Sequence, residues 1–215
     1  MHDFDAVIAT LALSLGVAWA CGLRLYIAVF VLGLASASGY IHLPASMDML
    51  QDPLVIGAAA LMCFIEFALD KTPGVDSGWD GVQTFIRIPA GAILAATAVG
   101  DVNPALLIAA GLAGGALTAG THFTKAGARA SINTSPAPVS SVLFKSNWVA
   151  SCGEDVAVLA GLWLALRQPA TFLVLLAAFV ALMIWLLPRL WRAIVLVFRK
   201  LASQLAKIAT DAPTV

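Results

Sequence analysis

Acidic side chains are concentrated in one short stretch of a chain that is otherwise poor in charge. Glu66 and Asp70 are four residues apart, so on a helix they share a face near its end. Asp76 and Asp80 follow beyond a Pro-Gly turn, and Arg87 comes about two turns into the next apolar run, where it can pair with Glu66. The stretch is therefore either an ion network that pins two helix ends together or a functional site for a cation or proton.

A polar stripe follows in the second half of the chain. His122, Lys125, Arg129 and Asn133 are separated by three or four residues, which places them on one face of a helix. Two cations at this spacing can bind a phosphate or a carboxylate, or they can balance the acids of the first stretch. A solvated cytoplasmic helix face would show the same pattern, so the sequence leaves both interpretations open.

The adjacent acids Glu154 and Asp155 are the sharpest indication of function. They lie within an apolar run, where a charge is costly and needs Lys125, Arg129, water or a cation as its partner. Converging carboxylates select hard cations such as magnesium, calcium or manganese, so a divalent cation is the cofactor that this chain could use. The candidate ion- or substrate-binding residues are Glu66, Asp70, Lys71, Asp76, Asp80, Arg87, His122, Lys125, Arg129, Asn133, Glu154 and Asp155, with Glu66, Asp70, Glu154 and Asp155 as candidate metal ligands.

The composition shows what kind of element must position these residues. Of 215 residues, 61% are hydrophobic and 11% are charged, and the mean hydropathy is +0.95. Soluble domains carry about 25% charged residues. The apolar stretches are long and do not alternate with polar residues, which favours membrane helices over barrel strands. The sequence therefore predicts an all-α, polytopic transmembrane helix bundle with the lipid bilayer as its partner. A net charge of zero gives no indication of a nucleic-acid partner.

About six spans are expected, because each needs roughly 20 mostly apolar residues. The first apolar run is interrupted at Gly22-Leu23-Arg24, and we interpret it as one broken span, although two shorter pieces would fit as well. The expected spans cover residues 6–37, 54–69, 81–100, a run that begins at Pro104, 147–166 and 170–187.

The basic residues predict the orientation, since short cytoplasmic loops are rich in Lys and Arg. Lys125, Arg129 and Lys145 surround one loop, and further basic residues follow Pro188. With six spans, both the N- and the C-terminus are expected in the cytoplasm. The chain then divides into a transmembrane bundle, residues 1–188, and a basic amphipathic helix and tail, residues 189–215, that lies at the membrane surface.

Four motifs resemble those of a family of small bacterial integral membrane proteins known as domain of unknown function 4126. The resemblance covers nearly the whole chain up to the C-terminal helix. It implies a multi-pass protein of the bacterial inner membrane and brings no activity with it. The motifs are Gly22-Leu23-Arg24, Glu66…Asp70-Lys71-x-Pro73-x-Val75-Asp76, Thr121-His122-x-x-Lys125-Ala126-Gly127-x-Arg129-Ala130 with Asn133-x-Ser135-Pro136, and Glu154-Asp155.

Three functions remain open on the sequence. The first is a transporter or channel for a small ion or polar solute, which uses the intramembrane acids balanced by the basic residues. The second is a non-catalytic scaffold or lipid-binding protein. The third is a metal-dependent enzyme acting on a lipid phosphate, although the chain has no catalytic nucleophile with a base beside it. Small residues such as Gly111 and Gly115 allow close helix packing, and a homo-oligomer also remains open.

Overall fold

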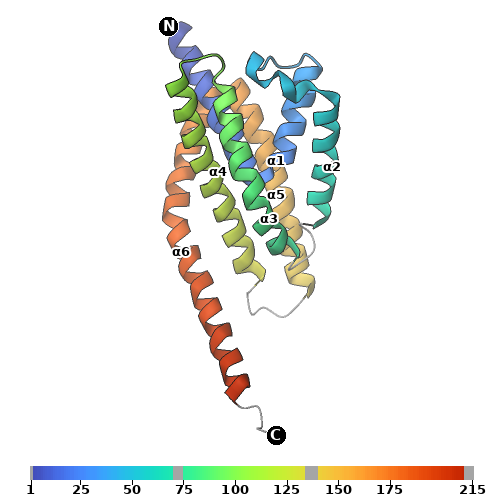
Figure 1. Cartoon of the computed structure of the whole chain (residues 1–215), viewed down its shortest axis with the longest axis vertical. Helices are drawn as coiled ribbons and strands as arrows, with labels where there is room; N and C mark the ends of the chain where they lie inside the picture. Colours follow the sequence, from blue (N-terminus) through green and yellow to red (C-terminus); the bar gives the residue numbers. More distant parts are fainter. Residues whose placement is uncertain (1, 70–74, 134–139, 211–215) are drawn as a thin grey trace.

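The computed structural model describes residues 2–69, 75–133 and 140–210, and these residues form a helical bundle (Figure 1). A short 3-10 helix, η1, lies between the first two long helices. The elements in chain order are α1 (His2–Ala37), η1 (Ala45–Gln51), α2 (Pro53–Leu69), α3 (Val75–Ala98), α4 (Pro104–Asn133), α5 (Ser140–Arg167) and α6 (Pro169–Thr210).

Three of the long helices start at proline, and the preceding side chain often caps the first turn. Asp52 Oδ1 accepts a hydrogen bond from the Leu54 N–H at the start of α2 (2.7 Å), and Asn103 Oδ1 accepts one from the Ala105 N–H at the start of α4 (2.8 Å). Proline suits the first helical position because its missing N–H would have no partner there. Gly100, with a φ of 76°, makes the tight turn between α3 and α4 that a side chain would disfavour.

Helix α1 is the centre of the bundle, and it doubles back on itself at Arg24. The backbone of Arg24 is not helical (φ −146°, ψ 77°), so the helix is kinked there. On the first half, Val7 lines an apolar pocket together with Val102 of the α3–α4 turn. Beyond the second half, the Tyr40 ring packs 5.0 Å from the guanidinium of Arg167, at the α5–α6 turn. Both ends of α1 therefore lie at the same end of the bundle, which we call the upper end (Figure 1).

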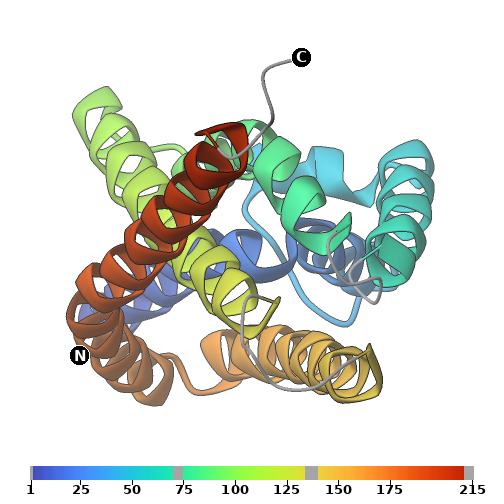
Figure 2. The ribbon, with the colours of Figure 1, turned by 90° about the horizontal axis from the view of Figure 1, so that it is seen from below.

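The other helices surround α1, as the view along the bundle shows (Figure 2). Small residues bring the helices close together. A Cβ on Gly161 of α5 would collide with the Trp19 ring, and one on Gly22 would lie 2.7 Å from the Thr118 carbonyl oxygen of α4. The upper part of the core is apolar and is formed by both halves of α1 with α3, η1 and α5; its fully buried members include Val17, Leu32, Met47, Val158 and Leu162.

The structure does not confirm six spans. In the described part of the chain, four helices are long and apolar enough to cross a membrane, or five if η1 and α2 are taken together across their 64° bend. Helix α2 has 17 residues, about 25 Å, which is short against a hydrocarbon layer of roughly 30 Å. Helix α1 is long enough, yet its two halves form a hairpin. The break at Gly22–Arg24 was expected, and what the sequence did not indicate is that the chain turns back there.

The termini lie at opposite ends of the bundle (Figure 1). This path differs from the six crossings on which the predicted orientation depends, because α1 was counted as a crossing and instead returns to the upper end. The five helices from α2 to α6 then bring the C-terminus to the opposite, lower end. The side of the membrane that each terminus faces stays a prediction.

Helix α6 continues through Pro188 to Thr210, with no end at the predicted boundary near residue 188. Arg189 is exposed, donates a hydrogen bond to the Trp185 carbonyl (2.8 Å) and packs 3.5 Å from the Trp185 ring. An Arg-Trp pair at this position is typical of a membrane interface. The division into residues 1–188 and 189–215 remains a prediction.

Candidate functional site: a buried ion network at the break of α1

The break in α1 exposes backbone carbonyls inside the bundle. The Leu23 carbonyl accepts hydrogen bonds from Arg87 Nη1 (3.1 Å) and Lys125 Nζ (3.0 Å), and Arg87 Nη1 also lies 3.4 Å from the Gly22 carbonyl oxygen. A helix that breaks away from water must satisfy its freed carbonyls with other groups. Here two buried cations from α3 and α4 do so.

Arg24 itself reaches two neighbouring helices, α2 and α5. Its guanidinium donates hydrogen bonds to the Ser151 hydroxyl (2.6 Å) and carbonyl (3.2 Å) on α5. Nη1 lies 3.4 Å from Glu66 Oε1 on α2, and Nε lies 3.3 Å from Glu154 Oε2 and 2.8 Å from Asp155 Oδ1. The side chain is 1% exposed, so the bend in α1 is held by a fully buried cation.

Glu66 forms ion pairs with basic side chains from three different helices, α1, α3 and α4. Its Oε1 atom pairs with Arg87 Nη2, and it lies 3.4 Å from Arg24 Nη1 and 3.6 Å from Lys125 Nζ. The predicted pairing of Glu66 with Arg87 is present. Both side chains are buried, so the pair lies in a medium where charge–charge attraction is strong and an unpaired charge would be costly.

Asp80 and His122 connect α3 with α4 beside this centre. Asp80 Oδ1 lies 3.6 Å from Lys125 Nζ and 3.9 Å from Arg87 Nη1. His122 Nε2 lies 2.8 Å from the Thr84 hydroxyl and 3.1 Å from the Asp80 carbonyl oxygen. Its Nδ1 atom lies 3.4 Å from Arg87 Nη1. The imidazole thus orients the guanidinium that pairs with Glu66.

Glu154 and Arg129 form the side of the network toward the lower end. Arg129 donates to both carboxylate oxygens of Glu154, from Nε (3.2 Å) and from Nη2 (2.9 Å), which is a bidentate pair. Glu154 Oε2 also lies 3.4 Å from Lys125 Nζ. The side chains of Glu154 and Asp155 are 14% and 21% exposed, whereas those of Arg24, Glu66 and Arg87 are at most 1% exposed. The network is therefore least enclosed on the side of α5.

The described network is electrically balanced. Its cations are Arg24, Arg87, Lys125 and Arg129, and its acids are Glu66, Asp80, Glu154 and Asp155. It lies near the lower ends of α2 and α3, because Glu66 is in the last turn of α2 and Asp80 is in the second turn of α3. The apolar core around Leu25, Leu32 and Leu94 separates it from the upper end.

Most of the candidate residues from the sequence are brought together. Glu66, Asp80, Arg87, His122, Lys125, Arg129, Glu154 and Asp155 all belong to this network. The stripe on α4 is not a solvated face, because His122, Lys125 and Arg129 are buried. Asp70 and Lys71 lie outside the described residues, as do the side chains of Asp76 and Asn133.

Each carboxylate of the network forms ion pairs with Arg or Lys side chains. Among the described residues, no group of three or more His, Cys, Asp and Glu side chains is placed to hold a metal ion. Of the candidate metal ligands, Glu66 and Glu154 each contact several cations, Asp155 contacts Arg24, and Asp70 is not described. The described carboxylates are therefore neutralised by basic side chains.

The sequence analysis noted Arg24 only as part of a helix break and did not include it among the candidate site residues. In the structure, Arg24 contacts Glu66, Glu154 and Asp155 of the network. An arginine within an otherwise apolar run is the signal that could have identified it, since such a residue almost always faces a polar interior. Ser151 and Gln83 were missed as well. Gln83 is fully buried and hydrogen-bonds the Tyr26 hydroxyl, with 3.2 Å between Oε1 and the hydroxyl oxygen. These neutral side chains carry no comparable signal in the sequence.

Comparisons with known proteins agree with the motifs. A family model described as a domain of unknown function (DUF4126) matches residues 11–189, which include both halves of α1 beyond residue 10 and every residue of the described network. No curated protein matches the chain, and no solved structure matches it.

Proposed function

Since the chain belongs to the DUF4126 family, whose description names no activity, we propose its function from the buried network: it is an integral membrane transporter or channel for a small ion or polar solute. The single observation that carries this proposal is the convergence of eight charged side chains from five helices at the break of α1. No step of the proposal requires a cofactor.

The cost of the network supports a functional role. Removing two charges from water costs several kcal/mol per ion, and replacing a buried ion pair by apolar side chains is often neutral or stabilising. Stability alone would therefore favour apolar residues at these positions. In membrane helices, ionisable side chains that face the bundle interior typically mark ion and substrate pathways.

The geometry of α1 supports the same conclusion. Broken helices that expose backbone carbonyls and charged groups at the middle of a bundle are a recurring way to build a transport site. Here the break places the carbonyls of Gly22 and Leu23 beside Arg87 and Lys125. The apolar core closes the upper side, and the network is least buried at Glu154 and Asp155.

We propose that the lower end of the bundle faces the cytoplasm of a bacterial inner membrane. The exposed residues Arg189 and Arg192 lie in the lower half of α6, whereas Asp48, Asp52 and Asp101 lie in the upper loops. Cytoplasmic segments that flank membrane helices carry an excess of Lys and Arg. The structure then corresponds to a state whose site is open to the cytoplasm and closed to the outside.

A flux assay in proteoliposomes tests the proposal. The full-length protein is reconstituted, and influx of labelled or optically detected ions is followed for sodium, potassium, chloride, acetate and phosphate under an imposed gradient. We expect protein-dependent flux of at least one ion, strongly reduced by Glu154→Gln and retained by Asp101→Asn, which removes a carboxylate from the opposite, exposed end. If Glu154→Gln leaves the flux as high as Asp101→Asn does, the proposal is contradicted.

A further inference from the structure

We propose that Arg24, Arg87 and Lys125 form a binding site for a small oxyanion with a carboxylate or phosphate group, and that Glu66 occupies this site in the present structure as an internal anion. The inference rests on the proposed transport function and names the substrate class of the same site. Transport would then proceed by exchange: the three cations bind the solute anion and the Glu66 carboxylate alternately.

Three cations converge on one carboxylate oxygen, Glu66 Oε1. Arg24 comes from α1, Arg87 from α3 and Lys125 from α4, and all three lie within hydrogen-bonding or ion-pairing distance of Glu66 Oε1. Two guanidinium groups and an ammonium group are the donors that proteins use to bind carboxylates and phosphates. Glu66 is thus held as a bound anion would be.

Some buried polar atoms around this centre lack hydrogen-bond partners within the described part of the chain. Glu66 Oε2, Arg87 Nε and the Thr121 hydroxyl are buried, and none of the three has a hydrogen-bond partner there. Buried polar groups without a partner are unusual and call for a ligand, an ion or water. A free oxyanion presents several oxygens at once and can use donors that a tethered carboxylate leaves unused.

Within the described residues, the network has as many acids as cations. An uncompensated charge in a buried site is very costly. Glu66 is the carboxylate on which three of these cations converge, so it is the group that an incoming anion would replace.

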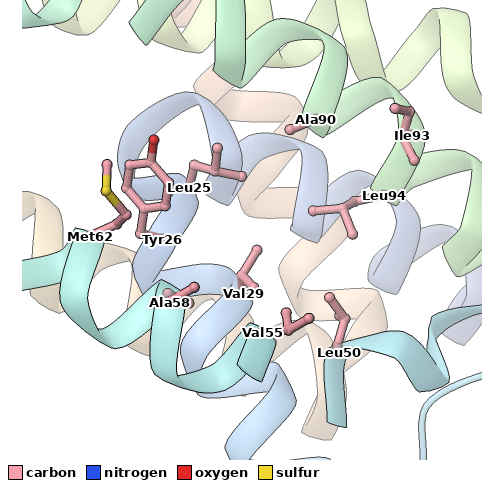
Figure 3. Close-up of a pocket in the computed structure, with 11 residues that line it drawn as sticks. Leu25, Tyr26, Val29, Leu50, Val55, Ala58, Met62, Ala90, Ile93 and Leu94 are labelled. Carbon is pink, nitrogen blue, oxygen red and sulfur yellow. The ribbon is translucent and has the colours of Figure 1, made fainter. Parts of the chain in front are cut away.

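Glu66 belongs to a peripheral helix. Helix α2 packs chiefly against α1 and η1 and makes little contact with α3, and it lies at the edge of the bundle (Figure 2). An apolar pocket of about 420 Å³, open at the surface, lies between α2 and α3 (Figure 3). Met62 of α2 and Ala90 of α3 line this pocket, and Glu66 and Arg87 lie about one turn further along the same helix faces. Because few contacts hold α2 to α3, a movement of α2 away from α3 would carry Glu66 away from the cations.

Anion-dependent thermal stability of the detergent-purified, full-length protein tests this inference. Sodium acetate and sodium phosphate are titrated into wild type and Glu66→Gln, with the ionic strength held constant by sodium chloride. A ligand that binds only the folded state at about a hundredfold its Kd raises the Tm of a protein of this size on the order of 5 °C. We expect such a rise for Glu66→Gln with acetate or phosphate, and a rise for wild type only at about tenfold higher concentration.

Two further variants keep the test decisive. The double variant Glu66→Gln/Arg87→Gln lacks one of the cations and should lose the anion response. Glu66→Asp retains the charge on a shorter side chain, so it should fold and respond at lower anion concentration than wild type. If neither acetate nor phosphate raises the Tm of Glu66→Gln or Glu66→Asp above the chloride control, the inference is wrong.

The outcome also separates this inference from the transport proposal. Flux without any oxyanion-dependent stabilisation would leave the transport proposal standing and overturn the oxyanion site. Oxyanion-dependent stabilisation of Glu66→Gln without flux in proteoliposomes would support the site and contradict transport.

Discussion

Arg24 Nη1 of α1 lies 3.4 Å from Glu66 Oε1 of α2, and both side chains are 1% exposed. This contact joins the bend of the central helix to the last turn of a peripheral one. Because Arg24 also binds Ser151, Glu154 and Asp155 on α5, a single side chain links three of the helices that surround the site. A movement of α2 or α5 must therefore change the surroundings of the break in α1.

The first prediction concerns the stability of the bend. Replacing Arg24 by Met should leave Glu66 and Asp155 with fewer cations in a buried site, and removal of one partner of a buried ion pair costs about 3–5 kcal/mol. We expect a strong fall in the Tm of the detergent-purified protein. Arg189→Met is the control, since Arg189 is exposed and its contacts to Trp185 are worth about 1 kcal/mol at most. Equal Tm values for the two variants would show that Arg24 does not hold the bend.

A second prediction concerns the pairing of Glu66 with Arg87. Each single substitution by Met should be strongly destabilising, whereas the double variant removes both charges and leaves no unpaired partner. A double-mutant cycle in thermal unfolding should give a coupling free energy on the order of 1–3 kcal/mol. The cycle of Glu66→Met with Arg129→Met should give a smaller coupling, because Arg129 pairs with Glu154. Additive effects in the first cycle would exclude a direct interaction.

A third prediction distinguishes two glycines by the space around them. A Cβ on Gly33 would collide with the Leu50 carbonyl oxygen of η1, whereas one on Gly57 of α2 would meet nothing within 4 Å. Gly33→Ala should therefore lower stability by about 1–3 kcal/mol. Gly57→Ala should be neutral or should stabilise α2 by up to about 1 kcal/mol, since alanine is the better helix former. The comparison fails if Gly57→Ala lowers the Tm as much as Gly33→Ala does.

A fourth prediction concerns topology. The structure places residues 38 and 101 at the upper end and residue 192 in the lower half of α6. In a variant without the native cysteines, Ser38→Cys and Asp101→Cys should react with an impermeant maleimide from one side of the membrane, and Arg192→Cys should react from the other. Labelling of Ser38→Cys and Asp101→Cys from opposite sides would mean that α1 or α2 has a different path.

The sequence predicts much of the helical fold and of the site for physical reasons. Long apolar runs leave little alternative to membrane helices, and prolines at positions 53, 104 and 169 fix where three of them start. Charges within those runs must face one another, so the meeting of Glu66 with Arg87 and of Glu154 with Arg129 could be inferred.

The path of α1 could not be predicted in the same way. The residues Gly22-Leu23-Arg24 indicate a break, but a break is compatible with a kinked crossing and with a hairpin. What decides between them is tertiary: the carbonyls of Gly22 and Leu23 find donors on Arg87 and Lys125, and Gly33 packs against η1. Those donors are more than 60 residues away in the sequence, and a local pattern does not encode such contacts.

The most direct test of the central claim is the initial rate of acetate and phosphate uptake by proteoliposomes that contain wild type, Glu66→Gln or Asp101→Asn. The buried network is the transport site in this account, and Glu66 must leave and return to the cations in each cycle. Wild type and Asp101→Asn should therefore take up one of these anions at similar rates, and Glu66→Gln should lose most of this uptake. Uptake by Glu66→Gln at the wild-type rate would contradict the account.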